Sequence, residues 1–392
     1  MCVVASRMPL CAPHPNSTPF MRILFTGGGT GVHFYPIIAV ARELRKLAEE
    51  ERILDLQLFY IGPDDFGRED LIKDNIIYYR VFSGKLRHYF SPMNALDSLF
   101  ILLGILQAAI KLLALMPDVI FSKGGYGSIP VLFVAHLYRI PVIIHESDTI
   151  PGKVNRWSSK FARRIAVSFD SSAAFFPKGR VALTGNPVRK RIFGGNIEEA
   201  KTDLNILTEN PVILITGGSQ GAEKINNAVL EVLPNLLEHY EIIHQAGEKK
   251  FEDATIQANA TLSSADKTRY HLYPFLRESQ LRQAYAVSHL VIARAGSGSI
   301  FEIAAMGKPS ILIPLKNAAQ DHQRKNAFEY AKAGAADVVE EDNLSPHILL
   351  AEVEKLFRNP AKMKAMGEAA QKFARIDAAE VIAREILHIG LH

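Results

Sequence analysis

Cysteine is almost absent from this chain of 392 residues. The two that occur, Cys2 and Cys11, both stand near the start, so the rest of the chain has no thiol. A disulfide framework or a cysteine-ligated metal site is therefore excluded for the body of the protein. This cysteine usage is compatible with a reducing cytoplasm.

Long runs of one charge are also lacking. Lys and Arg total 45 against 41 Asp and Glu, which gives a formal net charge of +4. With no dense basic run and no RNA-binding signature, we expect no nucleic-acid partner. Residues 1–20 lack the basic start and long apolar core of a signal peptide, and we expect them to form a disordered extension ahead of Met21.

From Met21 onward, apolar β-rich runs alternate with helical patterns, which predicts parallel βαβ units. The expected strands fall in two series, 22–26, 57–61, 76–82, 118–122, 141–145, 164–168 and 181–184, then 211–216, 241–245, 270–274, 289–293, 310–314 and 336–339. We therefore expect an α/β protein with two Rossmann-like, doubly wound domains. The expected divisions are an extension at 1–20, domains at 21–186 and 187–365, and a helical segment at 366–392 that packs back on the first domain.

Two glycine-rich loops follow buried strands, one in each expected domain, at 27–33 and 217–222. A turn of this kind presents backbone N–H groups and the positive end of a helix, so each loop is a possible diphosphate site. The first fails the dinucleotide pattern G-x-G-x-x-G because Val32 stands where the last glycine belongs. An NAD enzyme is thus a weak alternative.

Two side chains beside glycine turns have two possible roles each. His33 either bonds to its own loop or acts as a general base, since the unperturbed imidazole pKa is about 6.5. Glu302 forms the pattern S-x-x-E with Ser299, so it either caps its own helix or accepts hydrogen bonds from the two hydroxyls of a ribose. The residues alone leave both choices open.

Polar residues follow two other strands, at 124–127 and 145–148. Because ligands gather beyond the carboxyl ends of parallel strands, we expect both segments to line one cleft. Their two carboxylates and one histidine lack a diagnostic ligand spacing, so we expect neither a metal nor another cofactor.

Residues 99–116 form the most hydrophobic stretch, and their number approaches that of a transmembrane helix. Gln107 and Lys111 lie on one helical face of it, which argues against a span. Two interpretations remain open. One is a half-buried helix of an α/β domain; the other is an interfacial helix at a membrane, supported by the basic and aromatic residues at 85–90.

Seven motifs occur in an order that resembles the MurG family of glycosyltransferases. They are GGGTGVHFYP at 27–36, KGGYGS at 123–128, HESD at 145–148, GNPVR at 185–189, GGSQGA at 217–222, RAGSGSIFE at 294–302 and DHQRKNA at 321–327. The resemblance implies a GT-B fold. It also implies inverting transfer of N-acetylglucosamine from UDP-N-acetylglucosamine to the muramoyl 4-hydroxyl of lipid I, the undecaprenyl-diphospho-muramoyl pentapeptide, to form lipid II for peptidoglycan.

The resemblance also implies the site residues. His33 would be the general base, with Asp148 as second choice. Ser219 and Arg189 would contact the diphosphate and Glu302 the ribose. The implied substrate-binding set is Thr30, Gly31, Val32, Tyr126, Asp148, Arg189, Ser219, Gln220, Leu276, Ser297, Gly298, Ser299, Glu302 and Gln323. Of these, Leu276 would meet uracil through its backbone and Gln323 would bind the sugar hydroxyls.

The sequence departs from the family pattern at two positions. Val32 stands where the family loop has glycine, and valine does not tolerate the positive φ that glycine does. Asp148 replaces an asparagine, and its carboxylate could serve as a base. Another lipid or sugar acceptor, a UDP-sugar 2-epimerase and a binding protein without turnover remain alternatives. A polyprenyl acceptor further implies a peripheral protein on the cytoplasmic face of the bacterial cell membrane, where other cell-wall synthesis enzymes are possible partners.

Overall fold

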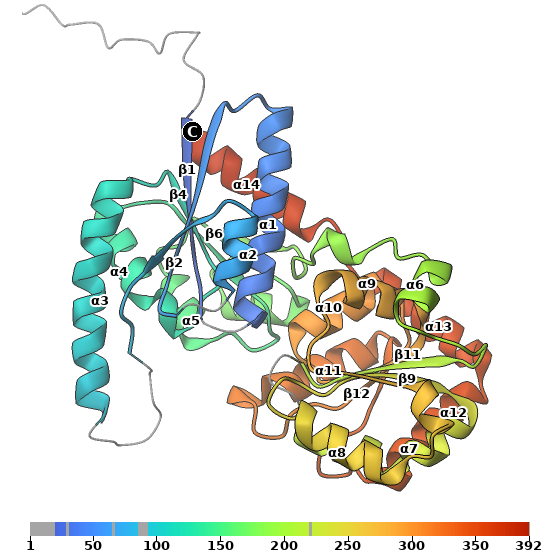
Figure 1. Ribbon diagram of the computed structural model, residues 1–392. Helices are drawn as coiled ribbons and strands as arrows, with labels where there is room; N and C mark the ends of the chain where they lie inside the picture. Colours follow the sequence, from blue (N-terminus) through green and yellow to red (C-terminus); the bar gives the residue numbers. More distant parts are fainter. Residues whose placement is uncertain (1–19, 29–30, 65–66, 85–92, 219–221, 392) are drawn as a thin grey trace, which may run out of the picture.

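A computed structural model describes residues 20–28, 31–64, 67–84, 93–218 and 222–391, which form two α/β domains (Figure 1). The first contains a seven-stranded sheet in the order β3-β2-β1-β4-β5-β6-β7, and the second a six-stranded sheet in the order β10-β9-β8-β11-β12-β13. All pairings are parallel.

The strands fall where the sequence predicted them. The first sheet consists of β1 (Phe20–Thr26), β2 (Asp55–Gly62), β3 (Ile77–Arg80), β4 (Val119–Ser122), β5 (Val142–Glu146), β6 (Arg164–Val167) and β7 (Val181–Leu183). The second consists of β8 (Val212–Thr216), β9 (Glu241–Gln245), β10 (Tyr270–Tyr273), β11 (Ser288–Ala293), β12 (Ser310–Leu312) and β13 (Ala336–Val338). Every residue of the central strands β4 and β8 is buried, as expected of parallel strands that helices cover on both faces.

Helices cover both faces of each sheet. Those of the first domain are α1 (Gly31–Glu50), α2 (Arg68–Lys73), α3 (Met93–Leu115), α4 (Ile129–Tyr138) and α5 (Lys153–Ser158). Those of the second are α6 (Ile197–Asp203), α7 (Glu223–His239), α8 (Phe251–Thr261), α9 (Glu278–Val287), α10 (Ser297–Ala305), α11 (His322–Lys332), α12 (Pro346–Phe357) and α13 (Pro360–Phe373). The 3-10 helices are η1 (Tyr126–Ser128), η2 (Asp170–Phe175), η3 (Lys190–Ile192), η4 (Asp266–Arg269) and η5 (Ala319–Asp321).

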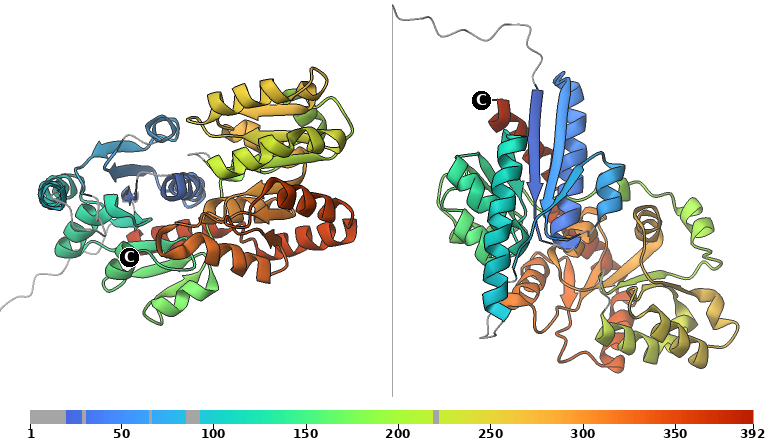
Figure 2. Two further views of the ribbon diagram at one scale, coloured as in Figure 1. Left: turned by 90° about the horizontal axis from the view of Figure 1, so that it is seen from below. Right: turned by 60° about the vertical axis from the view of Figure 1, so that its left-hand side comes forward.

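The last helix, α14 (Ala378–Leu391), leaves the second domain and returns to the first (Figures 1 and 2). Its Ile382 and Ile386 share a buried cluster with Ile37 and Val40 of α1. On the opposite side of the first sheet, α3 packs against α4 through Ala108 and Leu112 (Figure 1). The first domain is therefore completed by a helix from the far end of the chain.

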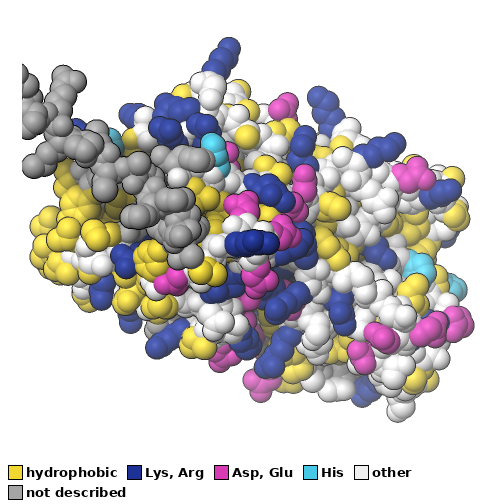
Figure 3. All heavy atoms as spheres, turned by 90° about the horizontal axis from the view of Figure 1, so that it is seen from above, with side chains coloured by type: hydrophobic (Ala, Val, Ile, Leu, Met, Phe, Trp, Pro, Cys, Tyr) yellow, Lys and Arg dark blue, Asp and Glu magenta, His cyan; other side chains and the backbone are white. Residues whose placement is uncertain are grey.

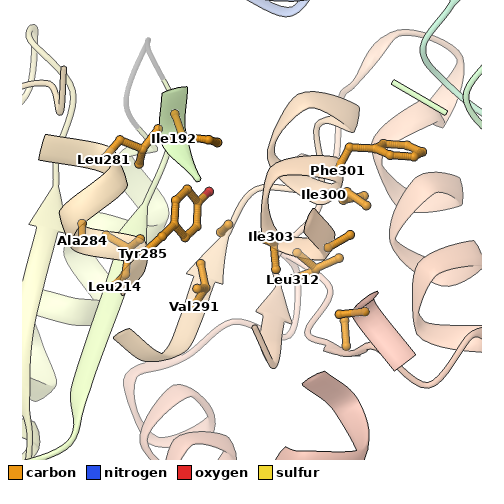
Figure 4. Close-up of a cluster of buried hydrophobic side chains, with 14 of the residues drawn as sticks. Ile192, Leu214, Leu281, Ala284, Tyr285, Val291, Ile300, Phe301, Ile303 and Leu312 are labelled. Carbon is orange, nitrogen blue, oxygen red and sulfur yellow. The ribbon is translucent and has the colours of Figure 1, made fainter. Parts of the chain in front are cut away.

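The chain crosses between the two sheets twice, at 184–211 and at 374–377. In the first crossing, Ile192 of η3 is fully buried in the core of the second domain, beside Leu281 and Tyr285 of α9 (Figure 4). This anchors the linker to the second domain. It also places the residues of the linker that come before Ile192, including Arg189, along the wall of the interdomain pocket.

Candidate active site

A pocket opens between the domains at the carboxyl ends of the second sheet. Tyr35 and Pro36 of α1 form its wall on the first domain. Five residues that the sequence predicted as substrate contacts also line it: Arg189, Leu276, Gly298, Ser299 and Glu302. This is the position at which open parallel sheets bind their ligands.

An ion pair between Arg189 and Glu302 lies inside this pocket. The guanidinium Nη2 is 2.9 Å from Glu302 Oε1, and the guanidinium also lies 4.1 Å from the centre of the Tyr35 ring. Glu278 Oε1 is 3.8 Å from Arg189 Nε. Burial alone would lower the pKa of Arg189, but the two carboxylates outweigh it and raise that pKa. The pocket thus holds a fixed cation and a fixed carboxylate side by side.

Helix α10 points its N-terminus at the pocket without a side-chain cap. The helix begins at Ser297, and its N-cap residue is Gly296, so Glu302 does not form the capping box that Ser299 would allow. The Oγ of Ser297 is buried and has no hydrogen-bond partner among the described residues. Uncapped N–H groups at a helix start attract anions. Helix α7 likewise has no side-chain cap at Ala222.

His33 lies in the first turn of α1, two residues before the pocket residue Tyr35. Its Nδ1 lies 3.1 Å from the carbonyl oxygen of Lys123. A carbonyl can only accept, so Nδ1 carries the proton and Nε2 keeps its lone pair. No hydrogen-bond partner of Nε2 is found in the described part of the chain, and the imidazole is only half-buried. Nε2 is therefore free to accept a proton.

Two glycines make room for this imidazole. A Cβ on Gly28 would lie 3.1 Å from His33 Cδ2, and one on Gly125 would lie 3.5 Å from Nε2 and 3.0 Å from the Gly28 backbone. Gly125 also has a φ of +79°, a backbone conformation that residues other than glycine rarely adopt. The close approach of the two glycine turns fixes where the histidine can sit.

The surroundings of His33 keep it neutral. Burial, and after it the positive charge of Lys123, lower the pKa of His33 to about 4, while Asp148 opposes them. His322, from the second domain, lowers it further. Near neutral pH the imidazole is thus unprotonated, which is the form that a general base requires.

Asp148 connects the two domains. Its Oδ1 accepts a hydrogen bond from Asn326 Nδ2 at 2.8 Å, and the Oδ1 of Asn326 accepts from Thr149 N–H at 2.9 Å and from the Thr149 hydroxyl at 3.0 Å. Asn326 lies on α11, within the motif DHQRKNA, and is fully buried. The Asp148 carboxylate already has this partner, whereas His33 Nε2 is open, so the geometry favours His33 as the base.

A buried polar cluster beneath His33 was not foreseen. The Nζ of Lys123 lies 2.5 Å from His145 Nδ1 and 3.3 Å from Asn186 Oδ1, and it also donates to the hydroxyl of Ser147. Burial is the main cause that lowers the pKa of Lys123 to about 7. The expectation that residues 145–147 line the cleft is wrong, because all three are buried under it.

Glu146 belongs to the same buried layer. Its carboxylate accepts hydrogen bonds from the backbone N–H groups of Asp148 and Gly152, both at 3.0 Å, and from Asn155 Nδ2 at 2.9 Å. These bonds determine the path of residues 147–152 and therefore the position of Asp148 and Thr149. The signal in the sequence was a polar run directly after an apolar strand. The partners of Glu146 are local, whereas those of His145 and Ser147 come from other segments.

The remaining predicted residues divide into three groups. The N–H of Leu276 donates to Gln245 Oε1 at 2.9 Å, so its carbonyl is the backbone group left for a ligand. Gln323, whose Oε1 accepts from Leu315 N–H at 3.0 Å, and Tyr126 of η1 do not line the pocket. Thr30, Ser219 and Gln220 lie outside the described residues, as do Lys85 to Phe90, and only the backbone of Gly31 and Val32 is described.

Metal-ligating side chains do not converge in the described part of the chain. No group of three or more His, Cys, Asp or Glu residues there is arranged to hold a metal ion.

Family models match both domains. The glycosyltransferase family 28 N-terminal domain matches residues 23–167, and the glycosyltransferase family 28 C-terminal domain matches residues 212–382.

Relatives match almost the whole chain. A UDP-N-acetylglucosamine–N-acetylmuramyl-(pentapeptide) pyrophosphoryl-undecaprenol N-acetylglucosamine transferase from Bacillus thuringiensis is 37% identical over 367 residues, 93% of this chain and 99% of its own. A transferase of the same name from Lachnospira eligens is 38% identical over 339 residues, 86% of this chain and 91% of its own.

Solved structures show the same architecture. MurG from Acinetobacter baumannii superposes with a TM-score of 0.69 at 25% identity and covers 94% of this chain and 99% of its own. A UDP-GlcNAc 2-epimerase from Neisseria meningitidis gives a TM-score of 0.65 at 15% identity, covering 94% of this chain and 100% of its own, a likeness of fold alone. Together with the two parallel-sheet domains, these likenesses confirm the expected GT-B fold.

Proposed function

This chain belongs to the MurG family of glycosyltransferases, and from that premise we propose how its residues carry out the family's reaction. The protein transfers N-acetylglucosamine from UDP-N-acetylglucosamine to the muramoyl 4-hydroxyl of lipid I, with inversion, and so forms lipid II for peptidoglycan. The observation that carries the proposal is the neutral His33, with Nε2 open, two residues before Tyr35, which lines a pocket with Arg189, Glu302 and the uncapped start of α10.

Donor binding rearranges the ion pair in the pocket. The Glu302 carboxylate accepts hydrogen bonds from the two ribose hydroxyls, and Arg189 turns toward the diphosphate, which replaces Glu302 as its main anionic partner. The carbonyl of Leu276 accepts from the uracil ring. This exchange is supported by the 2.9 Å contact, because it leaves neither buried charge without a partner at any stage.

The chemistry follows from the two sides of the pocket. The muramoyl hydroxyl attacks the anomeric carbon from the face opposite UDP, and His33 Nε2 takes its proton. Negative charge develops on the departing UDP. Arg189 and the N-terminal N–H groups of α10 stabilise it, together with the start of α7 and its glycine loop. Closure of the two domains excludes water and so suppresses hydrolysis of the donor.

The reaction itself is tested with a labelled donor. UDP-N-acetylglucosamine labelled in the sugar and a short-chain lipid I analogue are expected to yield labelled lipid II analogue with one UDP released for each transfer. Release of free sugar without the acceptor would instead indicate an epimerase or a hydrolase.

The pH dependence of the reaction reports on His33. Because the pKa of His33 is lowered to about 4, its imidazole stays in the basic form as the pH falls and is protonated only near that value. We expect kcat/KM for the donor, which reports groups of the free enzyme, to stay level from about pH 8 to 5 and to fall below that. An acidic limb centred near the unperturbed value of about 6.5 would contradict the lowered pKa of this base.

The outer face of α3 supports docking at a membrane. Apolar side chains spaced three or four residues apart are exposed there, with exposed fractions of 60 to 67% at Leu102, Leu106, Ile110 and Leu113. Figure 3 shows hydrophobic side chains gathered at this end of the molecule. In the described part of the chain, no helix has the length and apolar character needed to span a bilayer. One face of α3 is packed, as expected of a half-buried helix of an α/β domain. The other face is open, which supports the interfacial helix as a proposal.

We propose that this face inserts shallowly into the cytoplasmic surface of the cell membrane, where a soluble nucleotide sugar meets a polyprenyl-anchored acceptor. Contacts with other cell-wall synthesis enzymes remain a prediction.

Serine substitutions on α3 test the docking surface. Changing Leu102, Leu106 and Leu113 to serine is expected to weaken binding to phosphatidylglycerol-containing vesicles by at least about tenfold, since each inserted leucine contributes about 1.5–3 kcal/mol. The matched control changes Leu207 and Ile256, equally exposed in the second domain, to serine. Vesicle sedimentation measures binding, and UDP affinity should be the same in all variants. Equal vesicle binding by the α3 variant and the control would refute this surface.

A further inference from the structure

A second cleft, larger than the donor pocket, lies on the other side of Arg189. It encloses about 770 Å³ between α1 and α2 of the first domain, the linker at 189–193, and α9 with the residues before it. Tyr35, Arg189 and Phe275 line both hollows, so the two share one wall. A volume of this size accommodates a nucleotide-sized ligand.

Cationic side chains outnumber acidic ones along the wall of this second cleft. Seven cationic side chains line it against three acidic ones. The cations come from both domains and from the linker: Arg42, Lys73, Arg189, Lys190, Arg191, Arg277 and Arg282. Such a concentration in a walled hollow attracts anions more strongly than the same charges spread over a surface.

Carboxylates in and around the cleft pair with four of the seven cations. Arg42 bonds Asp74 and Glu278, both at 2.9 Å, and Arg189 bonds Glu302 at 2.9 Å. Lys190 lies 2.9 Å from Glu43 and 3.7 Å from Glu380, and Lys73 lies 3.8 Å from Asp70. Among the described residues, Arg191, Arg277 and Arg282 have no carboxylate within ion-pair distance. Three guanidinium groups are thus left to bind a ligand.

Two buried nitrogen atoms at this cleft also lack a hydrogen-bond partner among the described residues. The Nε atoms of Arg189 and Arg282 are buried, and neither has a hydrogen-bond acceptor in the part of the chain that is described. An unsatisfied buried N–H is costly, and a phosphate oxygen would satisfy it. Phe193 and Phe275 supply aromatic surface in the same cleft.

We propose that this cleft is a second anion site, which binds a soluble ligand with a diphosphate group while UDP occupies the donor pocket. Guanidinium groups match phosphate oxygens in planar, two-pronged contacts. The cleft adjoins α1 and α2, on the side of the first sheet opposite the exposed face of α3, so its ligand comes from solution rather than from the membrane (Figure 1). Because both domains line it, an occupant stabilises the arrangement in which they face each other.

Inorganic pyrophosphate is the probe for this site. Calorimetric titration of the full chain with pyrophosphate, with and without saturating UDP, is expected to show one binding event that persists in UDP. Changing Arg191 and Arg277 to alanine should weaken that event by at least about tenfold, the loss of one charge-assisted hydrogen bond or more. Both side chains are exposed, so folding should not depend on them. The control is Arg163→Ala, an exposed arginine directly before β6 that lines neither hollow.

Each outcome decides the question. Loss of all pyrophosphate binding in saturating UDP would overturn the proposal, because the anion would then have only the donor pocket. Equal affinity in the double variant and the control would overturn it as well. So would a double variant that binds pyrophosphate normally but binds phosphatidylglycerol vesicles less tightly, since the cations would then serve a lipid surface. Pyrophosphate binding needs neither acceptor nor catalysis, so failure of sugar transfer would leave this test intact.

Discussion

Replacing His33 by glutamine is expected to lower kcat for sugar transfer by about 10²–10⁴-fold, the usual contribution of general-base catalysis. The Nε2 of His33 is the nitrogen that we propose as the base, and the 3.1 Å bond from Nδ1 to the Lys123 carbonyl holds its ring in place. Glutamine offers an amide of similar length that cannot take a proton. UDP release with the lipid I analogue measures kcat, and UDP affinity should not change.

Asp148→Asn is the matched variant for this experiment. The asparagine oxygen can still accept the hydrogen bond from Asn326 Nδ2, but the side chain can no longer act as a base. We expect this variant to transfer sugar at nearly the wild-type rate. The reverse pattern, in which Asp148→Asn is inactive and His33→Gln is active, would make Asp148 the base.

Replacing Glu302 by alanine is expected to raise KM for the donor by about tenfold to a hundredfold, because two hydrogen bonds from ribose hydroxyls to a charged group are lost. Removal of this carboxylate also leaves the buried Arg189 with the more distant Glu278, 3.8 Å away, as its remaining anionic partner. We therefore expect the free energy of unfolding without ligand to fall by about 1–3 kcal/mol, less than for a fully uncompensated buried charge. Steady-state kinetics and denaturant unfolding measure the two effects.

A second ion pair supplies the control for Glu302. Arg164 and Glu385 form a pair at 2.7 Å on the surface, with the arginine side chain 44% exposed, and Glu385→Ala should change neither KM nor stability by much. A 2′-deoxyuridine donor adds a sharper criterion. It should bind the wild type less tightly than the normal donor does, whereas the Glu302→Ala variant should bind both alike. Equal discrimination by the two proteins would place the ribose elsewhere.

The strands were predictable because parallel strands covered on both faces must be apolar along their whole length. A run such as 212–216 shows this in the chain itself, without knowledge of its neighbours. The glycine turns were predictable for a similar reason, since close backbone approach is a local demand that only glycine meets. These features needed no long-range information.

The polar layer under His33 was not predictable in the same way. Whether residues 145–147 face a ligand or are buried depends on Lys123, which reaches them from the neighbouring strand. The contact between Asp148 and Asn326 joins residues 178 positions apart. Glu302 fitted a capping box in sequence, and only the position of Arg189 shows that its carboxylate is used otherwise. Local patterns identify which side chains are polar but not which of them meet.

The return of α14 to the first domain has a mechanical consequence. Two covalent connections, at 184–211 and 374–377, link the same two domains. With a single connection the two domains could rotate about several axes and separate. Two connections restrict their relative motion to rotation about one preferred axis. We therefore expect donor entry and UDP release to use one rotation of the domains, which would bring His33 back to the same orientation toward the donor pocket after each cycle.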